Sequence, residues 1–198
     1  MKPDLFGQEV ESLLARHESE PEHTRHVAFL AGWVFDGLQE RHRLGTDEAH
    51  LLRGAALLHD IGWSRTQPDG RGHHKVSAAM IREHSWRSIS DREVTLLAAV
   101  ARYHRRALPE SGHAEWEDLA PEDHTRMLWM AACLRLADGL DRRHLQLVSS
   151  LEMEFPDGNC RIRVRSAVEV EQEIEAGRKK SDLLSRIVGT AVEVIRMR

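Results

Sequence analysis

The sequence predicts a mainly α fold with a small C-terminal α+β unit. The hydrophobic pattern is helical from about residue 20 to 147, and its period becomes two after residue 147. Charged residues make up 30% of the 198 residues and the hydrophobic set 41%, which is typical of an ordinary globular protein. A chain of this length buries a core without disulfide or zinc staples. We therefore expect a helical domain over residues 1–147 and a small subdomain over residues 148–198 packed on it.

The helices of the predicted bundle carry local signals. Apolar residues recur at i, i+3, i+4, i+7 and i+11 from Val27 onward, which marks one face of a helix. Thr46 is suited to cap the next helix, and Gly62 is placed to end it. Ser90, with Glu93 three residues later, forms a capping-box pattern. Beyond the helix at Val27, we expect helices over residues 46–61, 73–84, 90–107 and 121–146.

The C-terminal unit is predicted from the change to alternating residues. Apolar residues alternate with glutamates over 151–155 and with arginines over 161–165, and PDGN at 156–159 is a turn. This pattern predicts a β-hairpin. A charged helix over 168–188 and a last strand over 190–196 follow. Because a two-stranded hairpin is only marginally stable alone, we expect these elements to complete a β-β-α-β unit.

Charge and cysteine content exclude several classes of protein. The formal net charge is −4, which provides no overall attraction to nucleic acid or to an anionic membrane. Two cysteines are too few for a secreted disulfide scaffold. We expect no signal peptide, because the N-terminal segment lacks an apolar stretch, and no apolar run approaches the roughly 18 residues that span a bilayer. We expect a cytoplasmic protein without a membrane partner, and a homodimer is the default expectation for its assembly.

Thirteen histidines stand out, and their placement suggests a metal site. His59 and Asp60 follow an apolar run at the end of a predicted helix. His26, His104 and Asp138 each share a helical stripe with apolar residues. A carboxylate buried on such a stripe costs several kcal/mol unless it is paired or bound to metal. One central divalent site, with Mn, Fe, Co, Zn or Mg, explains the set; the alternative for any single histidine is a hydrogen-bonded core residue.

The order of these residues resembles a known superfamily. His26, His59-Asp60, His74, His104 and Asp138 are arranged as in the HD superfamily of metal-dependent phosphohydrolases. Four segments are similar to the C-terminal HD-type domain of the exopolyphosphatase/guanosine pentaphosphate phosphohydrolase (Ppx/GppA) family. They are LLHDIG at 57–62, GHHKVSAAMI at 72–81, ARYHRRALP at 101–109 and LRLADGLDRRH at 134–144. The resemblance covers about residues 22–198 and implies an HD-domain helical bundle.

The resemblance also implies a ligand set and catalytic roles. The ligands of a first metal would be His26, His59, Asp60 and Asp138. His74 and His104 would bind a second metal or contact the substrate, and His73 is the alternative to His74. Asp60, together with His59, would be catalytic, because Asp60 can orient or deprotonate the attacking water. One or two divalent ions per chain are therefore expected.

The chain departs from the family pattern in two ways. Family members carry an N-terminal ATPase domain of actin-like fold, in which their phosphohydrolase chemistry resides. This chain starts almost at the HD part, so polyphosphate hydrolysis by that route is not carried over. Val76 and His84 also stand where the family often has a histidine and an asparagine. These two changes leave the implied ligand set intact.

Cations beside the motif residues are candidates for phosphate binding, because guanidinium groups match phosphate oxygens bidentately. They are Lys75, Arg102, Arg105, Arg106 and Arg142. For each of them a solvated surface charge is the alternative. Asp141 either accepts a hydrogen bond from a ligand histidine or lies at the surface. The run at 178–180 is interpreted as solvated and paired with the acids at 169–175.

Two functions remain open at this point. The first is a metal-dependent phosphohydrolase of the HD type, acting on a phosphate ester or anhydride of a nucleotide or polyphosphate-like substrate. The second is a non-catalytic module that binds a phosphorylated ligand or regulates another chain. A nuclease is a weaker third possibility, because the net charge is negative and no extended basic surface is evident.

Overall fold

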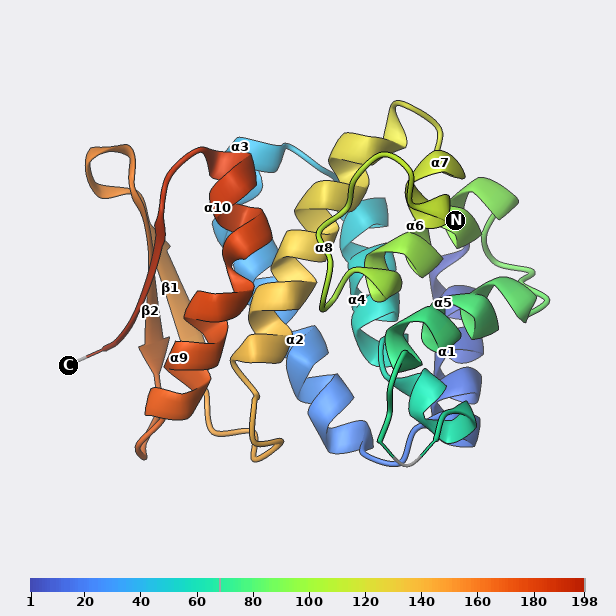
Figure 1. The fold of residues 1–198 in the computed structure, drawn as a ribbon, viewed down its shortest axis with the longest axis horizontal. Coiled ribbons are helices and arrows are strands. Elements are labelled where there is room, and N and C mark those ends of the chain that lie inside the picture. Colours follow the sequence, from blue (N-terminus) through green and yellow to red (C-terminus); the bar gives the residue numbers. More distant parts are fainter. Residues whose placement is uncertain (68, 198) are drawn as a thin grey trace.

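Helices make up most of the structure, and a three-stranded sheet lies at one end of them (Figure 1). This computed structural model describes residues 1–67 and 69–197. The helices are α1 (Pro3–His17), α2 (Pro21–Gly37), α3 (Gln39–His42), α4 (Thr46–Leu58), α5 (His73–Glu83), α6 (Asp91–Arg102), α7 (Ala114–Glu117), α8 (Asp123–Gly139), α9 (Glu171–Lys180) and α10 (Asp182–Val188). The predicted mainly α class with a small C-terminal sheet is confirmed. Within the described residues, no helix is both long and apolar enough to cross a membrane.

The sheet has the strand order β1-β2-β3. Its strands are β1 (Ser150–Glu154), β2 (Cys160–Arg165) and β3 (Val192–Arg196). The first two form the predicted antiparallel hairpin, with Leu151 opposite Val164. β3 pairs with β2 in parallel, so the chain must cross over between them, and it does so through α9 and α10. The β-β-α-β order is therefore present, with its helix divided in two.

Two predicted helices end earlier than their periodicity indicates. α6 ends at Arg102 rather than near residue 107, and α8 ends at Gly139 rather than near residue 146. Soon after each helix a residue takes a left-handed conformation, with φ of 64° at Arg106 and 56° at His144. Such residues turn the chain back, so polar side chains that follow each helix lie near its end. The pocket described below opens at these two helix ends.

The N-terminal helix α1 is an element that the sequence analysis missed. Phe6, Val10, Leu13 and Leu14 follow the i, i+4, i+7 and i+8 spacing of a helix face, and all four are buried. This face packs against α4. The predicted helix over 168–188 is also interrupted, because α9 ends before Ser181 and α10 begins after it.

The core is centred on α2. The apolar face that begins at Val27 and continues to Leu38 is fully buried, as predicted. α2 packs against α4 and α8, and its other contacts include β1 (Figure 1). α9 and α10 pack against α8, so α8 lies between the N-terminal helices and the C-terminal unit. The domain boundary near residue 147 stays a prediction.

Glycines allow α8 and α9 to approach each other closely. A Cβ atom on Gly139 would lie 2.9 Å from the Ala176 carbonyl oxygen and 3.0 Å from the Gly177 Cα. A Cβ on Gly177 would lie 2.8 Å from the Leu140 side chain. Since real Cβ atoms do not approach other atoms this closely, larger residues would force the helices apart. The end of α9 is thereby held against the end of α8.

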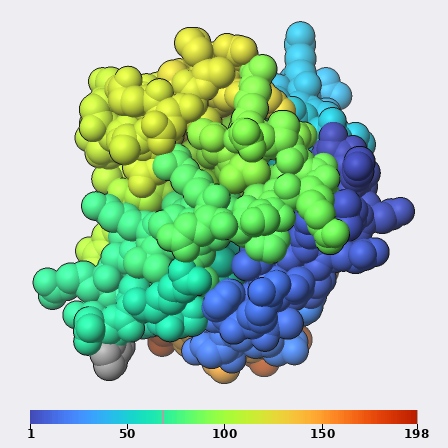
Figure 2. Space-filling view, turned by 90° about the vertical axis from the view of Figure 1, so that its right-hand side faces the viewer, coloured from blue at the N-terminus to red at the C-terminus, as the bar shows by residue number. Residues whose placement is uncertain are grey.

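The buried carboxylate of Glu9 fastens α1 to the loop before α6. Figure 2 shows α1 in blue beside segments coloured teal to green. Glu9 is 6% exposed and accepts hydrogen bonds from the backbone N–H of Arg87 at 3.0 Å and of Ser88 at 3.2 Å. Burial alone would raise the pKa of Glu9, but these bonds and the Ser88 hydroxyl hold that pKa below its usual value.

We expect Glu9→Gln to lower the free energy of unfolding by about 1–3 kcal/mol at pH 7, because charge-assisted bonds to buried donors are lost. A carboxyl whose pKa is lowered by folding stabilises the fold above its unfolded value and loses this effect as pH falls through the folded value. The gap between variant and wild type should therefore narrow below about pH 4.5, as measured by urea unfolding. Glu11→Gln, in an exposed pair with Arg25, is the matched control. A gap of equal size at pH 7 and pH 3 would contradict the assignment.

Candidate metal centre

His59 and Asp60 stand where α4 ends and a short 3₁₀ turn, η1 (Ile61–Arg65), begins. The next residue but one, Gly62, lies directly on α5. A Cβ there would lie 2.2 Å from the His73 carbonyl oxygen, and the Gly62 N–H donates to Ser77 Oγ at 2.9 Å. The turn is therefore fixed to the start of α5, which brings the two segments of the motif together.

Four histidines from four segments point the same ring nitrogen toward one centre. Each uses Nδ1 to bond an oxygen: His23 to Asp141 Oδ2 at 2.8 Å, His59 to Ala56 O at 2.7 Å, His73 to Gly70 O at 2.9 Å and His104 to Ala101 O at 2.8 Å. A carbonyl or carboxylate oxygen only accepts, so Nδ1 must carry the hydrogen in each ring. In the neutral ring, Nε2 then keeps its lone pair, which is the form that binds metal.

Among the residues that the structure describes, two groups of three side chains each offer ligand atoms within 4.8 Å of one another. One group is His23, His59 and Asp138, and the other is His59, Asp60 and His104. His59 belongs to both. The Nε2 atoms of His23 and His59 and Oδ1 of Asp60 are buried without a hydrogen-bond partner among the described residues. Because unpartnered buried polar atoms are costly, this donor set fits a bound divalent cation.

His73 completes the cluster. Its Nε2 lies 3.1 Å from Asp60 Oδ1 and 3.4 Å from His104 Nε2. The Arg105 guanidinium donates to the same Nε2 at 3.2 Å, which agrees with a hydrogen on Nδ1. Trp63 stacks on the His73 ring at a centroid distance of 4.7 Å. The imidazole is thus held on one face by an aromatic ring and at its Nε2 by a cation.

Two of the histidines that the sequence analysis named lie elsewhere. His26 is half-buried one turn along α2 from His23, on the side that carries the exposed Phe29 and Trp33. The buried stripe that begins at Val27 extends back to His23, four residues earlier, and not to His26. The spacing is visible in the sequence, and it favours His23, one turn before the predicted His26. The structure therefore brings His23, not His26, to His59 and Asp138.

His74 is buried and belongs to neither group of three, although its ring centroid lies 6.2 Å from that of His104. Its Nδ1 has no hydrogen-bond partner among residues 1–67 and 69–197. Burial, followed by the positive charge of Arg102, lowers the pKa of His74 to about 4. Its neighbour His73 contacts Asp60 instead, so the structure favours the alternative that the sequence analysis left open.

The electrostatics of the centre favour cation binding. Burial lowers the pKa of His104 well below its usual value, so its ring is neutral at pH 7. Burial alone would raise the pKa of Asp138, but the Lys180 ammonium beside it holds that pKa below its usual range. The centre therefore combines a neutral imidazole with an ionised carboxylate, as an N/O metal site requires.

A cavity of about 450 Å³ opens over the centre, and Asp60, His104 and Asp138 lie in its wall. Its cationic lining residues are Arg105, Arg106, Arg142, Lys179 and Lys180. A second cavity of about 270 Å³ shares Asp60 and has Glu18, Glu20 and His23 in its lining. The centre thus lies between a strongly basic cavity and an acidic one.

Three of the five cations predicted to bind phosphate line the basic cavity, and two do not. Arg105, Arg106 and Arg142 are in its wall. Lys75 is exposed on α5. Arg102 is 5% exposed, with its Nε 3.3 Å from Glu115 Oε1 and its guanidinium over the Tyr103 ring. The chain turns away after α6, which separates Arg102 from the arginines that follow it.

The two lysines of the basic cavity were not foreseen. Lys179 pairs with Glu175, as the sequence analysis expected for this run, but it also lines the cavity. Lys180 instead contacts Asp138, 42 positions earlier. No periodicity or motif in the sequence links these two positions, because the contact depends on how α9 packs on α8.

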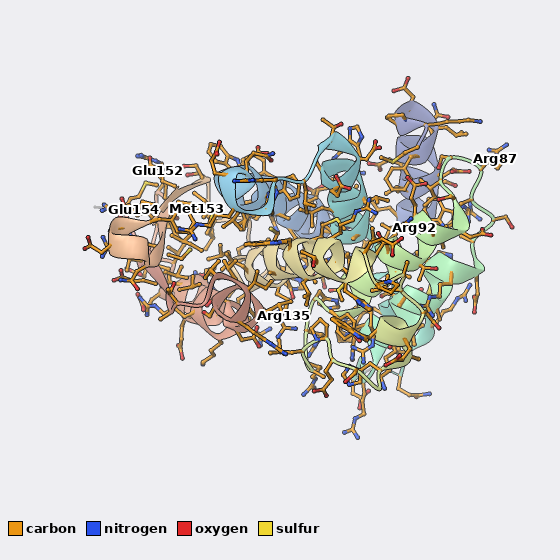
Figure 3. The ribbon with its side chains drawn as sticks, turned by 90° about the horizontal axis from the view of Figure 1, so that it is seen from above. Arg87, Arg92, Arg135, Glu152, Met153 and Glu154 are labelled. Carbon is orange, nitrogen blue, oxygen red and sulfur yellow. The ribbon has the colours of Figure 1, made fainter. Side chains whose placement is uncertain are left out.

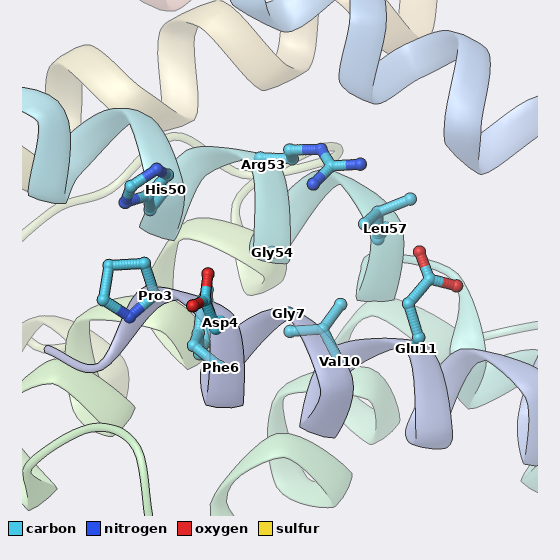
Figure 4. A pocket seen from close by; sticks show the side chains of 10 residues that line it. All are labelled: Pro3, Asp4, Phe6, Gly7, Val10, Glu11, His50, Arg53, Gly54 and Leu57. Carbon is cyan, nitrogen blue, oxygen red and sulfur yellow. The ribbon is translucent and has the colours of Figure 1, made fainter.

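A separate cavity of about 320 Å³ lies between α1 and α4, away from the histidine cluster (Figure 4). Its lining includes His50, Arg53, Asp4 and Glu11. These four side chains do not form a group of converging ligand atoms among the described residues.

Asp141 should be necessary for tight metal binding, because it fixes the hydrogen of His23 on Nδ1. We expect Asp141→Asn to weaken Mn²⁺ affinity about 10–100-fold, the usual effect of changing an outer hydrogen-bond partner of a ligand histidine. An amide can turn its NH₂ toward Nδ1, which moves the ring hydrogen to Nε2. Titration calorimetry measures the affinity, and Asp157→Asn in the exposed hairpin turn is the control. Equal affinities of the wild type and both variants would contradict this role.

Comparison with known families supports the resemblance given by the motifs. A family model described as Ppx/GppA phosphatase, domain III, matches residues 7–176. No curated protein matches the chain. The matched range contains all the converging histidines and both aspartates, and it ends four residues before Lys180. Since the match spans most of the chain, this protein belongs to the family of Ppx/GppA phosphatase, domain III.

Proposed function

We propose that the protein is a metal-dependent phosphohydrolase of the HD type, which hydrolyses a phosphate ester or anhydride of a nucleotide or polyphosphate-like substrate. One observation carries the proposal. Histidine nitrogens and two carboxylates converge at the wall of a cavity that five cations also line. Membership of a phosphatase family agrees with it.

The residues that would hold metal follow from the two groups. His23, His59 and Asp138 are the candidates for one divalent ion, and His59, Asp60 and His104 are the candidates for a second. A divalent ion bound there would acidify water near neutral pH and withdraw negative charge from the phosphate. These side chains suit a divalent ion because the Nε2 atoms of His23 and His59 and Oδ1 of Asp60 are buried without a hydrogen-bond partner among the described residues.

The remaining residues would position the substrate and move the proton. Asp60 is the candidate base, because its Oδ1 lies within the cluster and its side chain lines both cavities. Arg105 is held by its bond to His73, so its guanidinium is oriented before a substrate arrives. Arg106 and Arg142 add charge in the same cavity. Guanidinium groups bind phosphate oxygens in pairs, which would direct the phosphorus toward Asp60.

Phosphate release is the direct test of this function. The wild type, supplied with Mn²⁺, should release phosphate from a nucleoside triphosphate, a phosphomonoester or tripolyphosphate. Asp60→Ala should reduce the rate by about 10²–10⁴, the usual contribution of a general base. His26→Ala is the control, because His26 lies outside both groups. Equal rates in the wild type and Asp60→Ala would contradict the proposal.

A second candidate function is a binding or regulatory module for phosphorylated ligands. The cluster of five cations favours it, since such a cavity binds phosphate without any chemistry. The same experiment separates the two. Tight binding of tripolyphosphate by the metal-loaded protein, with no release of phosphate, would support the module and exclude the hydrolase.

A further inference from the structure

Among the described residues of α9, only Lys180 forms an ion pair with a side chain of the histidine and aspartate cluster. Its ammonium contacts Asp138 Oδ2, and the side chain is 27% exposed. The other carboxylate oxygen, Oδ1, lies 3.7 Å from His23 Nε2. Asp138 thus has one oxygen on a protein cation and the other toward the candidate metal ligands.

The contact depends on the packing of the C-terminal unit. Gly139 and Gly177 allow α9 to lie directly on α8, and Lys180 follows three residues after Gly177. The neighbouring Lys179 is 73% exposed and pairs with Glu175 on its own helix. Two adjacent lysines therefore have different environments, and only one of them neutralises a side chain of the cluster. Lys180 also lies beyond the residues that the family model matches.

An ammonium and a divalent ion compete for Asp138. A carboxylate that is 12% exposed needs a counter-charge, and Lys180 supplies one when no metal is bound. A divalent ion on Asp138 would supply that charge and would repel the ammonium, because like charges a few ångströms apart repel strongly in a partly buried site. Lysine has a flexible four-carbon stem, so the ammonium can move without moving α9.

The cavity offers a place for the displaced ammonium. Lys180 lines the same cavity as Arg105, Arg106 and Arg142. An ammonium released from Asp138 would stay among these cations, and an anion in the cavity would relieve their mutual repulsion. Metal on Asp138 and phosphate in the cavity would therefore favour each other, as linkage between two sites requires.

We infer that Lys180 is a positioning residue which competes with metal for Asp138 and, once displaced, binds a phosphate oxygen of the ligand. The inference rests on the proposed function for the identity of the site, but it concerns binding alone. It predicts opposite effects of one substitution on two affinities. Removal of the ammonium should strengthen metal binding and weaken anion binding.

The test measures Mn²⁺ binding to the full chain by titration calorimetry, without any substrate. Lys180→Met should bind Mn²⁺ about 10-fold more tightly than the wild type, because a competing charge is gone. Lys180→Arg keeps the charge and should bind Mn²⁺ more weakly than Lys180→Met. Lys75→Met, at an exposed residue of α5 outside the cavity wall, should match the wild type within about 3-fold. Thermal unfolding of each metal-free variant verifies that it is folded.

The second measurement uses sulfate, a tetrahedral anion that cannot be hydrolysed, on the Mn²⁺-loaded protein. Lys180→Met should bind sulfate several-fold more weakly than the wild type. An unchanged or weaker Mn²⁺ affinity in Lys180→Met would overturn the inference, as would an unchanged sulfate affinity. Neither measurement involves turnover. A protein that shows both shifts but releases no phosphate would retain the role of Lys180 and lose the hydrolase proposal.

Discussion

His59→Ala is expected to remove metal binding from the whole centre, since His59 is the residue common to both groups of ligands. Loss of an outer partner of a ligand histidine already weakens affinity about 10–100-fold, and loss of the ligand itself should have a larger effect. Phosphate release should fall to the uncatalysed rate at the same time. Titration of the purified variant with Mn²⁺, followed by calorimetry, measures the loss. A variant that still binds Mn²⁺ with the wild-type affinity would show that the centre lies elsewhere.

His23→Ala and His26→Ala form a matched pair for the same centre, because both residues are on α2 and one turn apart. His23→Ala should weaken Mn²⁺ binding strongly. His26→Ala should leave it within about 3-fold of the wild type, because the His26 ring belongs to the side with Phe29 and Trp33. The reverse result would restore the ligand set implied by the sequence resemblance.

The largest expected effect on stability comes from Arg135, which joins α8 to the C-terminal unit (Figure 3). Arg135 is 3% exposed and forms a bidentate pair with Asp182 at 2.9 and 2.7 Å. It also donates to the carbonyl oxygens of Tyr103 at 2.9 Å and Arg106 at 3.3 Å. The same side chain therefore fixes α10 and the turn that carries Arg105.

Arg135→Met should lower the free energy of unfolding by about 3 kcal/mol, because buried acceptors lose their donor and the Asp182 carboxylate loses its partner. Urea unfolding measures this change. Arg163→Met, in the more exposed pair with Glu154, should cost no more than about 1 kcal/mol. Arg135→Met should also bind sulfate more weakly than the wild type, because the turn at Arg106 is no longer held. Equal destabilisation by the two substitutions would contradict the role of Arg135.

The fold was largely predictable because it follows from local patterns. The stripe that begins at Val27 is buried as its period predicts, and the alternation around Leu151 and Val164 is paired in the sheet. The capping box at Ser90 is present at the start of α6. Helix ends were less predictable, since the left-handed residue Arg106 leaves no trace in the hydrophobic period.

The sequence predicts that the candidate site consists of histidines and aspartates, but it predicts less well which histidines take part. The pair His59-Asp60 and the partners His104 and Asp138 are brought together where the motifs indicated. The fifth member is a histidine of α2, and the choice between His23 and His26 depends on helix phase. These two residues are three positions apart, which places their side chains about one turn apart along the helix.

Two features of the site could not be predicted from the sequence: which of two adjacent histidines faces Asp60, and which distant residue contacts Asp138. His73 and His74 are the first two residues of α5, where the hydrophobic period does not yet define which side chain faces inward. In the structure, His73 is the one that contacts Asp60. Lys180 enters the centre only through the close packing of Gly139 and Gly177, which is a tertiary feature.

The metal content of the purified protein, grown or incubated with Mn²⁺, tests the central claim most directly. We expect one or two divalent ions per chain in the wild type by elemental analysis, and a loss of metal in Asp60→Ala, measured on protein shown to be folded. Wild-type protein without bound metal, even after Mn²⁺ is supplied, would contradict the metal centre, and with it the proposed hydrolase.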